Sequence, residues 1–114
     1  MSSDQAYVYI LANGYKRLYV GVTTRLAQRI EEHKTSANPK SFTTRYNIKQ
    51  LVYYECYESI SQAIARETEL TEWLRIKKLE LIISTNPTWR DLSLEWGKPI
   101  EPFEESNLRP PETF

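Results

Sequence analysis

Two segments rich in β-branched and aromatic residues flank an Asn-Gly pair near the start of the chain, and they constrain the fold more than any other feature. Residues 7–12 and 17–22 have the composition of two strands joined as a β-hairpin. Their aliphatic residues at even-numbered positions are Val8, Ile10, Leu18, Val20 and Val22. Directly opposed residues share a sheet face, so this common parity requires a loop of three or five residues rather than two. We expect the even-numbered residues to form the core face, and Tyr9 and Tyr19 to lie close together on the opposite face.

The rest of the chain alternates helical patterns with one further strand. After the hairpin we expect a helix over about 25–34 capped by Thr23 or Thr24, a long basic loop over 35–49 and a strand over 50–56. These are followed by a helix over about 60–78 capped by Ser59 or Ser61, and by another helix over 77–83. A short helical or irregular segment over 89–96 comes last. The Asn86-Pro87 pair should end the helix that precedes it. The chain is therefore predicted to have an α/β (α+β) fold, with a three-stranded antiparallel sheet flanked by helices.

The chain has 114 residues, which is enough for one domain with a modest core. We expect that domain over residues 1–96, followed by a flexible tail over 97–114 that is rich in Pro and Glu. The single cysteine, Cys56, cannot form an internal disulfide, and one Cys with one His excludes the usual ligand set of a zinc site. The sequence contains neither an apolar run of membrane-spanning length nor a signal peptide, so the cytoplasm is the predicted location.

Charge is distributed unevenly along the chain, although the net charge is zero. Residues 16–49 carry eight basic and two acidic side chains, which gives this segment a net charge of +6. Such a cationic segment is what phosphate binding requires, because neutralising phosphates releases counterions. The candidate nucleic-acid-binding side chains are Lys34, Lys40, Arg45 and Lys49. A solvated basic surface without a ligand is the alternative explanation of the same pattern.

Glu67 occupies an unusual position in the predicted helix over 60–78. The apolar residues that recur there at three- and four-residue spacing are Ile60, Ala63, Ile64, Leu70 and Leu74. Glu67 lies on the same stripe, and glutamate is almost never buried alone. Two roles are therefore open. Glu67 is either the partner of a Lys or Arg at the edge of the stripe, or a carboxylate that binds a metal ion in a pocket.

Several short matches along residues 7–92 carry a family resemblance. They are Tyr7-Val8-Tyr9, Tyr19-Val20-Gly21, Arg29, His33, Glu67 and Asn86, in this order and at suitable spacing. On these residues the chain resembles the GIY-YIG nuclease superfamily, and in particular its small single-domain bacterial branch. The resemblance implies a metal-dependent endonuclease that hydrolyses phosphodiester bonds in DNA with little sequence specificity of its own.

The resemblance also implies a role for the matched side chains. Glu67 would hold one Mg²⁺ or Mn²⁺ ion, and Arg29 would brace the scissile phosphate with its planar guanidinium. Tyr9 would take the proton of the attacking water, while Tyr19 and His33 would orient groups or relay the proton. We expect these five side chains to converge on one concave site.

Asn86 completes the catalytic set that the resemblance implies. The sequence departs from the family at Val22, where several members carry a lysine, so one cation near the phosphate is absent. The chain also lacks an appended DNA-binding module, which leaves room for a protein partner that selects the target. Two other functions stay open: a non-catalytic nucleic-acid-binding or adaptor domain that keeps the fold, and a nuclease of RNA or of single-stranded DNA.

Overall fold

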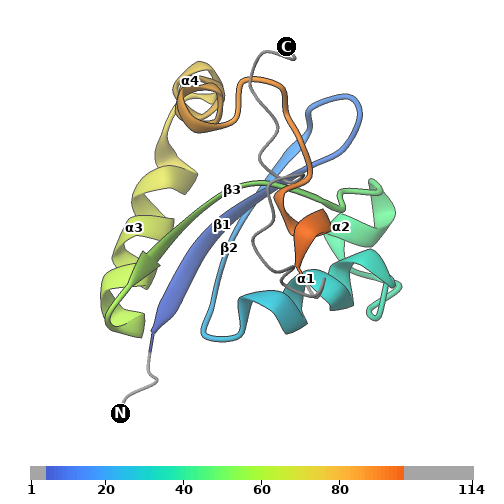
Figure 1. Cartoon of the computed structure of the whole chain (residues 1–114), viewed down its shortest axis with the longest axis horizontal. Coiled ribbons are helices and arrows are strands. Elements are labelled where there is room, and N and C mark those ends of the chain that lie inside the picture. The colour runs from blue at the N-terminus through green and yellow to red at the C-terminus, as the bar shows by residue number, and fades with distance from the viewer. Residues whose placement is uncertain (1–4, 97–114) are drawn as a thin grey trace, which may run out of the picture.

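The computed structural model describes residues 5–96, which form a three-stranded antiparallel sheet with helices on both faces (Figure 1). The strands are β1 (Ala6–Ala12), β2 (Leu18–Thr23) and β3 (Gln50–Tyr57), in the order β2-β1-β3. The helices are α1 (Leu26–Lys34), α2 (Phe42–Arg45), α3 (Ile60–Glu72) and α4 (Arg75–Thr85), followed by a 3₁₀ helix, η1 (Leu92–Glu95). The predicted fold class is confirmed. The predicted tail over 97–114 lies outside the described residues.

The β1–β2 hairpin has the odd-length loop that residue parity predicts. Ala12 pairs with Leu18, so five residues, 13–17, connect the strands. The side chain of Asn13 organises this loop, because its Oδ1 accepts hydrogen bonds from the backbone N–H groups of Tyr15 and Arg17. Its Nδ2 donates to the backbone carbonyl of Tyr46 at 2.8 Å, which ties the loop to the end of α2.

Both faces of the sheet are buried, so the expectation of a single core face is wrong. On one face, Val8 packs in a cluster with Ala63 and Leu70 of α3. On the other face, Tyr9 packs in a cluster with Ile30 of α1. The central strand is therefore apolar at odd and even positions alike, because helices cover it from both sides (Figure 1).

Strand β3 contains one residue more than the part of β1 that it faces. Ile10 pairs with Tyr53 and Leu11 pairs with Leu51, so Val52 has no partner on β1. This is a β-bulge, in which two residues of one strand oppose a single residue of the other. Val52 and Tyr53 both pack in the cluster that contains Ile10, and they share this cluster with α4.

The helices begin and end at positions that differ from the sequence expectations. The predicted loop over 35–49 contains α2, which Ser41 caps by accepting a hydrogen bond from the N–H of Thr44. Helix α1 has no side-chain cap, and Thr23 accepts instead from the N–H of Arg25 before the helix begins. The predicted helix over 60–78 is wrong at its end, because α3 stops at residue 72 and α4 begins at residue 75.

Three further expectations for this half of the chain are confirmed. Ser59 caps α3 by accepting a hydrogen bond from the N–H of Gln62. Helix α4 ends immediately before Asn86-Pro87, and a short helical turn, η1, follows. As a separate finding over all the described residues, no helix within 5–96 is both long enough and apolar enough to cross a bilayer.

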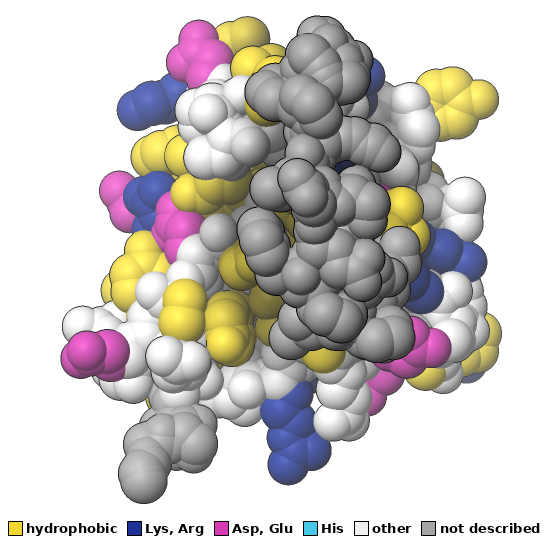
Figure 2. Space-filling model, in the orientation of Figure 1, with side chains coloured by type: hydrophobic (Ala, Val, Ile, Leu, Met, Phe, Trp, Pro, Cys, Tyr) yellow, Lys and Arg dark blue, Asp and Glu magenta, His cyan; other side chains and the backbone are white. Residues whose placement is uncertain are grey.

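The apolar stripe predicted around Glu67 is only partly buried. Ala63 and Leu70 are 0% exposed, whereas Ile60 and Ile64 are 42% and 47% exposed. Hydrophobic side chains are accordingly visible on the side of the molecule that α3 and α4 occupy (Figure 2). The buried line of α3 therefore passes through Ala63 and Leu70, and the half-buried Glu67 lies beside this line.

Candidate active site

Tyr9, on the central strand, lies at the middle of the candidate site. Its side chain is 2% exposed, and its partner across β1 and β2 is Gly21. A β-carbon added at Gly21 would lie 2.4 Å from Tyr9 Cζ and 2.5 Å from Tyr9 Oη, well inside contact distance. Only glycine therefore allows the Tyr9 phenol to lie over the neighbouring strand, where it approaches the backbone closely.

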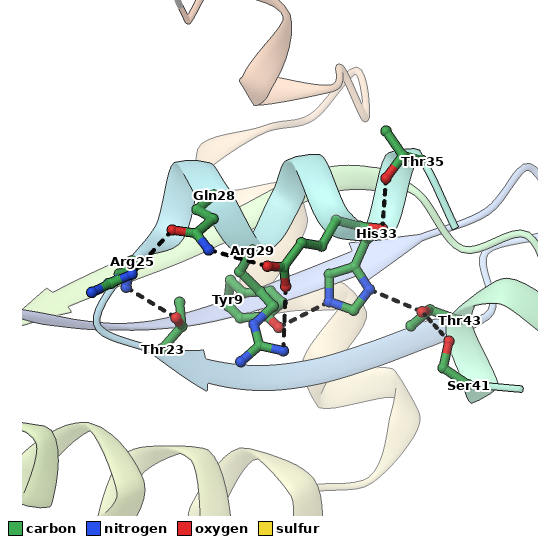
Figure 3. Close-up of polar contacts among 10 residues, drawn as sticks. Tyr9, Thr23, Arg25, Gln28, Arg29, His33, Thr35, Ser41 and Thr43 are labelled. Carbon is green, nitrogen blue, oxygen red and sulfur yellow. Dashed lines mark hydrogen bonds and ion pairs between the residues drawn. The ribbon is translucent and has the colours of Figure 1, made fainter. Parts of the chain in front are cut away.

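His33, near the end of α1, contacts the Tyr9 hydroxyl. Tyr9 Oη and His33 Nε2 are 3.1 Å apart, and His33 Nδ1 is 2.9 Å from Thr43 Oγ1. Thr43 is 2% exposed, and its hydroxyl also contacts Ser41 Oγ at 3.2 Å. Figure 3 shows this line of hydrogen bonds, which runs from Tyr9 through His33 to Thr43 and Ser41. It joins β1, α1 and α2 at one place.

Tyr19 and Arg29 border the same group of side chains. The ring centre of Tyr19 lies 6.2 Å from that of Tyr9 and 5.5 Å from that of His33. The two tyrosines thus share a sheet face, as strand parity predicts. Arg29 lies one turn before His33 on α1 and extends towards Tyr9 (Figure 3). Its Nη1 is 3.7 Å from Glu32 Oε1, and both side chains are about half exposed, so this contact can yield to a ligand.

An open cavity of about 340 Å³ lies beside these side chains. Its lining includes Tyr19, Arg29, His33 and Phe42. A cationic guanidinium, a phenol and an imidazole thus face one space. A phosphate group is a suitable ligand for such a space, because guanidinium matches phosphate in charge and geometry.

Burial determines the protonation states in this cluster. Burial raises the pKa of the Tyr9 phenol above its ordinary value, and Tyr19 raises it further, while the Arg29 guanidinium opposes the rise. Burial lowers the pKa of His33 below its ordinary value, and Arg29 lowers it further. At neutral pH the phenol therefore keeps its proton, and the imidazole is neutral and able to accept one.

Helical geometry places Glu67 on the β2 side of α3. With about 100° per residue, Arg66 and Glu67 lie on opposite flanks of the buried line through Ala63 and Leu70. Arg66 reaches Glu55 on β3, where its Nε lies 2.9 Å from Glu55 Oε1. Because the strand order is β2-β1-β3, the opposite flank of α3 faces β2. Glu67 therefore lies towards the strand that carries Tyr19, but on the other face of the sheet. The expectation that it converges on one concave site with the other four side chains is not met.

The Glu67 carboxylate has no ion-pair partner within the described residues, so the ion-pair role has no support there. Its Oε2 has one contact, at 3.4 Å, with the hydroxyl of Thr71. The described part of the chain contains no group of three His, Cys, Asp or Glu side chains that could hold an ion. A single carboxylate fits Mg²⁺ or Mn²⁺, since such hard ions keep several waters and complete their coordination with phosphate oxygens.

Asn86 is not brought into this cluster. The side chain is 2% exposed, and its Nδ2 donates to the backbone carbonyls of Val52 at 3.1 Å and Arg90 at 2.9 Å. Its Oδ1 accepts from the N–H of Arg90 at 3.0 Å. These three hydrogen bonds support the turn after α4 and the bulge in β3. These contacts give Asn86 a structural role, in contrast to the catalytic role predicted from the sequence.

The four predicted nucleic-acid-binding residues fall into two groups. Lys34 forms an ion pair with Asp91 and donates to the backbone carbonyl of Lys49 at 3.1 Å, so its ammonium is used within the fold. Lys40 and Arg45 are exposed, and Lys49 is half-buried. The expectation that Lys34 binds phosphate is therefore not supported, whereas Lys40 and Arg45 are accessible to a ligand.

Two residues of the site escaped the sequence analysis as functional groups. Gly21 gave a signal, since an isolated glycine within a strand often marks a close backbone approach. Thr43 gave none, because it lies in a polar segment without periodicity and becomes a partner of His33 only when α2 forms. Both residues act on Tyr9, Gly21 by making room for the ring and Thr43 by holding the imidazole.

Comparison with known proteins agrees with the motifs. The model of the GIY-YIG catalytic domain matches residues 5–80. A UPF0213 protein of Haloquadratum walsbyi is 37% identical over 79 residues, which cover 69% of this chain and 88% of that protein. A UPF0213 protein of Staphylococcus aureus is 37% identical over 79 residues, which cover 69% of this chain and 95% of that protein.

A solved structure is also similar. The solution NMR structure of the UPF0213 protein BH0048 from Bacillus halodurans has 25% sequence identity and a TM-score of 0.49, and the match covers 83% of this chain and 99% of that chain. The match to the family model and the identity with the relatives above decide the family. The chain belongs to the GIY-YIG nuclease superfamily, as one of its small members.

Proposed function

We propose that this protein is a divalent-metal-dependent endonuclease that hydrolyses phosphodiester bonds in DNA with little sequence preference. One observation carries the proposal: the Tyr9 hydroxyl lies 3.1 Å from Nε2 of His33, and His33 and Arg29 line the same cavity. A proton acceptor, a phenol and a phosphate-binding cation thus meet at one place. Phosphodiester hydrolysis requires these groups together with a site for an electrophile.

Tyr9 and His33 would act as one proton relay. In the tautomer that this role requires, the Tyr9 O–H would donate to His33 Nε2, while the second ring nitrogen would donate to Thr43 Oγ1. When water attacks the phosphorus, its proton would pass to Tyr9 Oη while the phenol proton passes to His33 Nε2. The raised pKa of Tyr9 prevents a free phenolate at rest, so the neutral imidazole is what gives the phenol basic character.

Arg29 would bind the non-bridging oxygens of the scissile phosphate. Among residues 5–96, its guanidinium forms an ion pair with Glu32 alone, and this contact is long and about half exposed. A phosphate can displace this contact and form two parallel N–H···O hydrogen bonds, which are shorter and stronger. Arg29 would thereby stabilise the charge that develops in the transition state.

Glu67 would hold the divalent ion. Nucleases of this superfamily generally use divalent metal ions. When bound, Mg²⁺ or Mn²⁺ would supply Lewis-acid stabilisation of the phosphate oxygens. The position of Glu67 on the β2 side of α3 supports this role, because the substrate strand can contact Tyr19 and Glu67 together only at the β2 edge of the sheet.

A non-catalytic nucleic-acid-binding or adaptor domain is the second candidate. The observation that favours it is the rise in the pKa of Tyr9 caused by burial, which opposes a catalytic base. Such a domain would bind DNA through exposed side chains such as Lys40 and Arg45 and would leave the phosphodiester bond intact.

A cleavage assay separates these functions. Purified protein would be incubated with Mg²⁺ or Mn²⁺ and end-labelled single-stranded DNA, duplex DNA, branched DNA or RNA, with chelator as the blank. We expect metal-dependent cleavage of DNA by the wild type and none by Arg29→Ala or Glu67→Gln. Binding without cleavage in every metal-containing sample would favour the adaptor, and cleavage of RNA alone would reassign the substrate.

A further inference from the structure

An ion pair fixed at two points joins α3 to β3. Arg66 Nε lies 2.9 Å from Glu55 Oε1, and Arg66 Nη2 lies 3.0 Å from Glu55 Oε2. The hydroxyls of Tyr53 and Tyr57 donate to the same carboxylate at 2.5 Å and 2.6 Å. The two charged side chains are mostly buried, with 21% of Arg66 and 17% of Glu55 exposed. These four residues are called the Glu55 clamp below.

The Glu55 clamp restrains the rotation of α3 as well as its distance from the sheet. A planar guanidinium held at two nitrogens cannot turn without losing a hydrogen bond. Burial by itself would raise the pKa of Glu55, but the hydrogen bonds from Arg66, Tyr53 and Tyr57 outweigh burial and hold that pKa below its usual value. The carboxylate therefore stays charged at neutral pH, and the clamp stays closed.

Glu67 follows Arg66 directly on the same helix and points to the opposite flank. A side-chain end lies about 5–6 Å from the helix axis, so a rotation of about 20° would move the Glu67 carboxylate by about 2 Å. A misplacement of about 1 Å can cost about 100-fold in rate when a catalytic group has to meet a reacting centre. A small rotation of α3 would therefore be sufficient to impair a catalytic role of Glu67.

We propose that the Glu55 clamp is the positioning device for Glu67, and that it fixes the rotation of α3 at which this carboxylate faces the β2 edge. The inference rests on the proposed function, because it assigns the clamp to the carboxylate that would hold the divalent ion. Glu55, Arg66, Tyr53 and Tyr57 act through Glu67 and touch neither substrate nor ion.

The test compares variants that open the clamp with one matched control. Arg66→Lys keeps the charge and loses the two-point contact, and Tyr57→Phe removes one hydrogen bond to Glu55. Because loss of one partner leaves a buried charge that can unfold the protein, Glu55→Gln combined with Arg66→Met removes both charges together. The control is Glu69→Gln. Glu69 contacts Arg66 Nη1 at 2.9 Å within α3, and 55% of its side chain is exposed.

Three quantities are measured on each preparation, at a temperature well below its unfolding midpoint. They are kcat and KM for DNA cleavage, the metal concentration at half-maximal rate, and the broadening of the Glu67 and Thr71 amide NMR signals by Mn²⁺ without DNA. We expect the clamp variants to lower kcat by about 10- to 100-fold, with KM changed by less than about twofold. They should also raise the metal concentration at half-maximal rate and weaken the Mn²⁺ broadening, whereas Glu69→Gln should match the wild type.

The outcomes separate this inference from the proposed function. If folded Arg66→Lys and the double variant keep the wild-type kcat and Mn²⁺ broadening, the clamp only stabilises the fold and the inference is wrong, although the nuclease stands. A loss of kcat in Glu69→Gln equal to that in Arg66→Lys would also overturn it, because charge rather than position would then be responsible. If the wild type itself neither cleaves DNA nor shows Mn²⁺ broadening near Glu67, the proposed function fails and takes the inference with it.

Discussion

The phenol of Tyr9 and the α-carbon of Gly21 occupy adjoining positions across the β1–β2 ladder, with no room for a methyl group between them. Tyr9 is held from the other side by His33. The ring is therefore confined between a strand and a helix, and the position of its hydroxyl depends on a residue that has no side chain.

Gly21→Ala should displace the Tyr9 ring. A new β-carbon 2.4 Å from Tyr9 Cζ forces the ring or the strand to move, and such overpacking costs about 1–3 kcal/mol of the free energy of unfolding. DNA cleavage should fall together with stability. Urea unfolding and the cleavage rate of the same sample test this. Gly14→Ala is the matched control, since nothing lies within 4 Å of a β-carbon at Gly14, and it should behave as the wild type.

Glu67→Gln should abolish metal-dependent cleavage and leave the fold intact. The change keeps the shape of the side chain and removes the charge that binds the cation. Because Glu67 forms no ion pair within residues 5–96, we expect the unfolding midpoint to stay close to that of the wild type. Thermal unfolding and cleavage are measured on one preparation. A large loss of stability with normal specific activity would instead indicate a structural carboxylate.

The unfolding free energy should decrease as the pH falls below about 6.5, the ordinary pKa of histidine. Burial and Arg29 lower the pKa of His33 in the folded state, so the unfolded chain binds a proton that the folded chain still rejects. Stability is then lost until the pH passes the folded pKa. Once the pH falls through the folded pKa, His33 becomes protonated and cannot accept the proton of Tyr9, so the cleavage rate should fall at this lower pH.

The measurement is simple because the chain contains one histidine. Proton NMR of its ring signals gives the folded pKa directly, which should lie below 6.5. His33→Gln should remove this part of the slope in a plot of unfolding free energy against pH. A ring pKa above 6.5 would contradict both the burial of His33 and its role as proton acceptor.

Lys40 and Arg45 should dominate electrostatic binding to DNA, while Lys34 should contribute to stability. Replacing each exposed residue by alanine should reduce the slope of log affinity against log salt by up to about 0.9 if it contacts a phosphate. Lys34→Ala should leave that slope unchanged and cost about 1–3 kcal/mol of unfolding free energy, because Asp91 loses its partner. Fluorescence anisotropy over a salt series gives the slope, and urea unfolding gives the stability.

Asn86→Ala should destabilise the protein by about 1–3 kcal/mol and leave kcat of the folded molecules unchanged. The amide is buried and makes three hydrogen bonds, so its removal strands backbone groups of Val52 and Arg90. Chemical unfolding gives the first quantity, and cleavage well below the unfolding midpoint gives the second. A loss of kcat without loss of stability would restore the catalytic role predicted from the sequence.

Strand parity was sufficient to predict the Tyr9–Tyr19 face and the odd loop, because side chains alternate strictly along a strand. Helix α2 could not be predicted in this way, since a four-residue helix such as Phe42–Arg45 shows no period. The break between α3 and α4 was also hidden, because Trp73-Leu74 contains neither glycine nor proline. Tertiary contacts determine where α2 forms and where α3 ends. A local sequence pattern does not show those contacts.

The candidate site could likewise be predicted from the sequence only in part. Tyr9, Arg29 and His33 could be named from motifs, and the structure brings them together. The flank of α3 that carries Glu67 could not be predicted, because it depends on how Arg66 meets Glu55 across two elements. Asn86 was assigned to catalysis because a sequence pattern cannot distinguish an amide that binds backbone carbonyls from one that faces a substrate.

The bulge at Val52 and the amide of Asn86 form one structural unit. The additional residue in β3 has no partner on β1, and Asn86 donates to its carbonyl from the far end of α4. Without this residue the ladder would be regular, and the amide 34 positions later would lose the partner that ties it to β3 while keeping its two hydrogen bonds to Arg90. Strand length and the identity of a distant residue should thus covary among related sequences. A change at either position alone should be rare, because it leaves a backbone group without its partner.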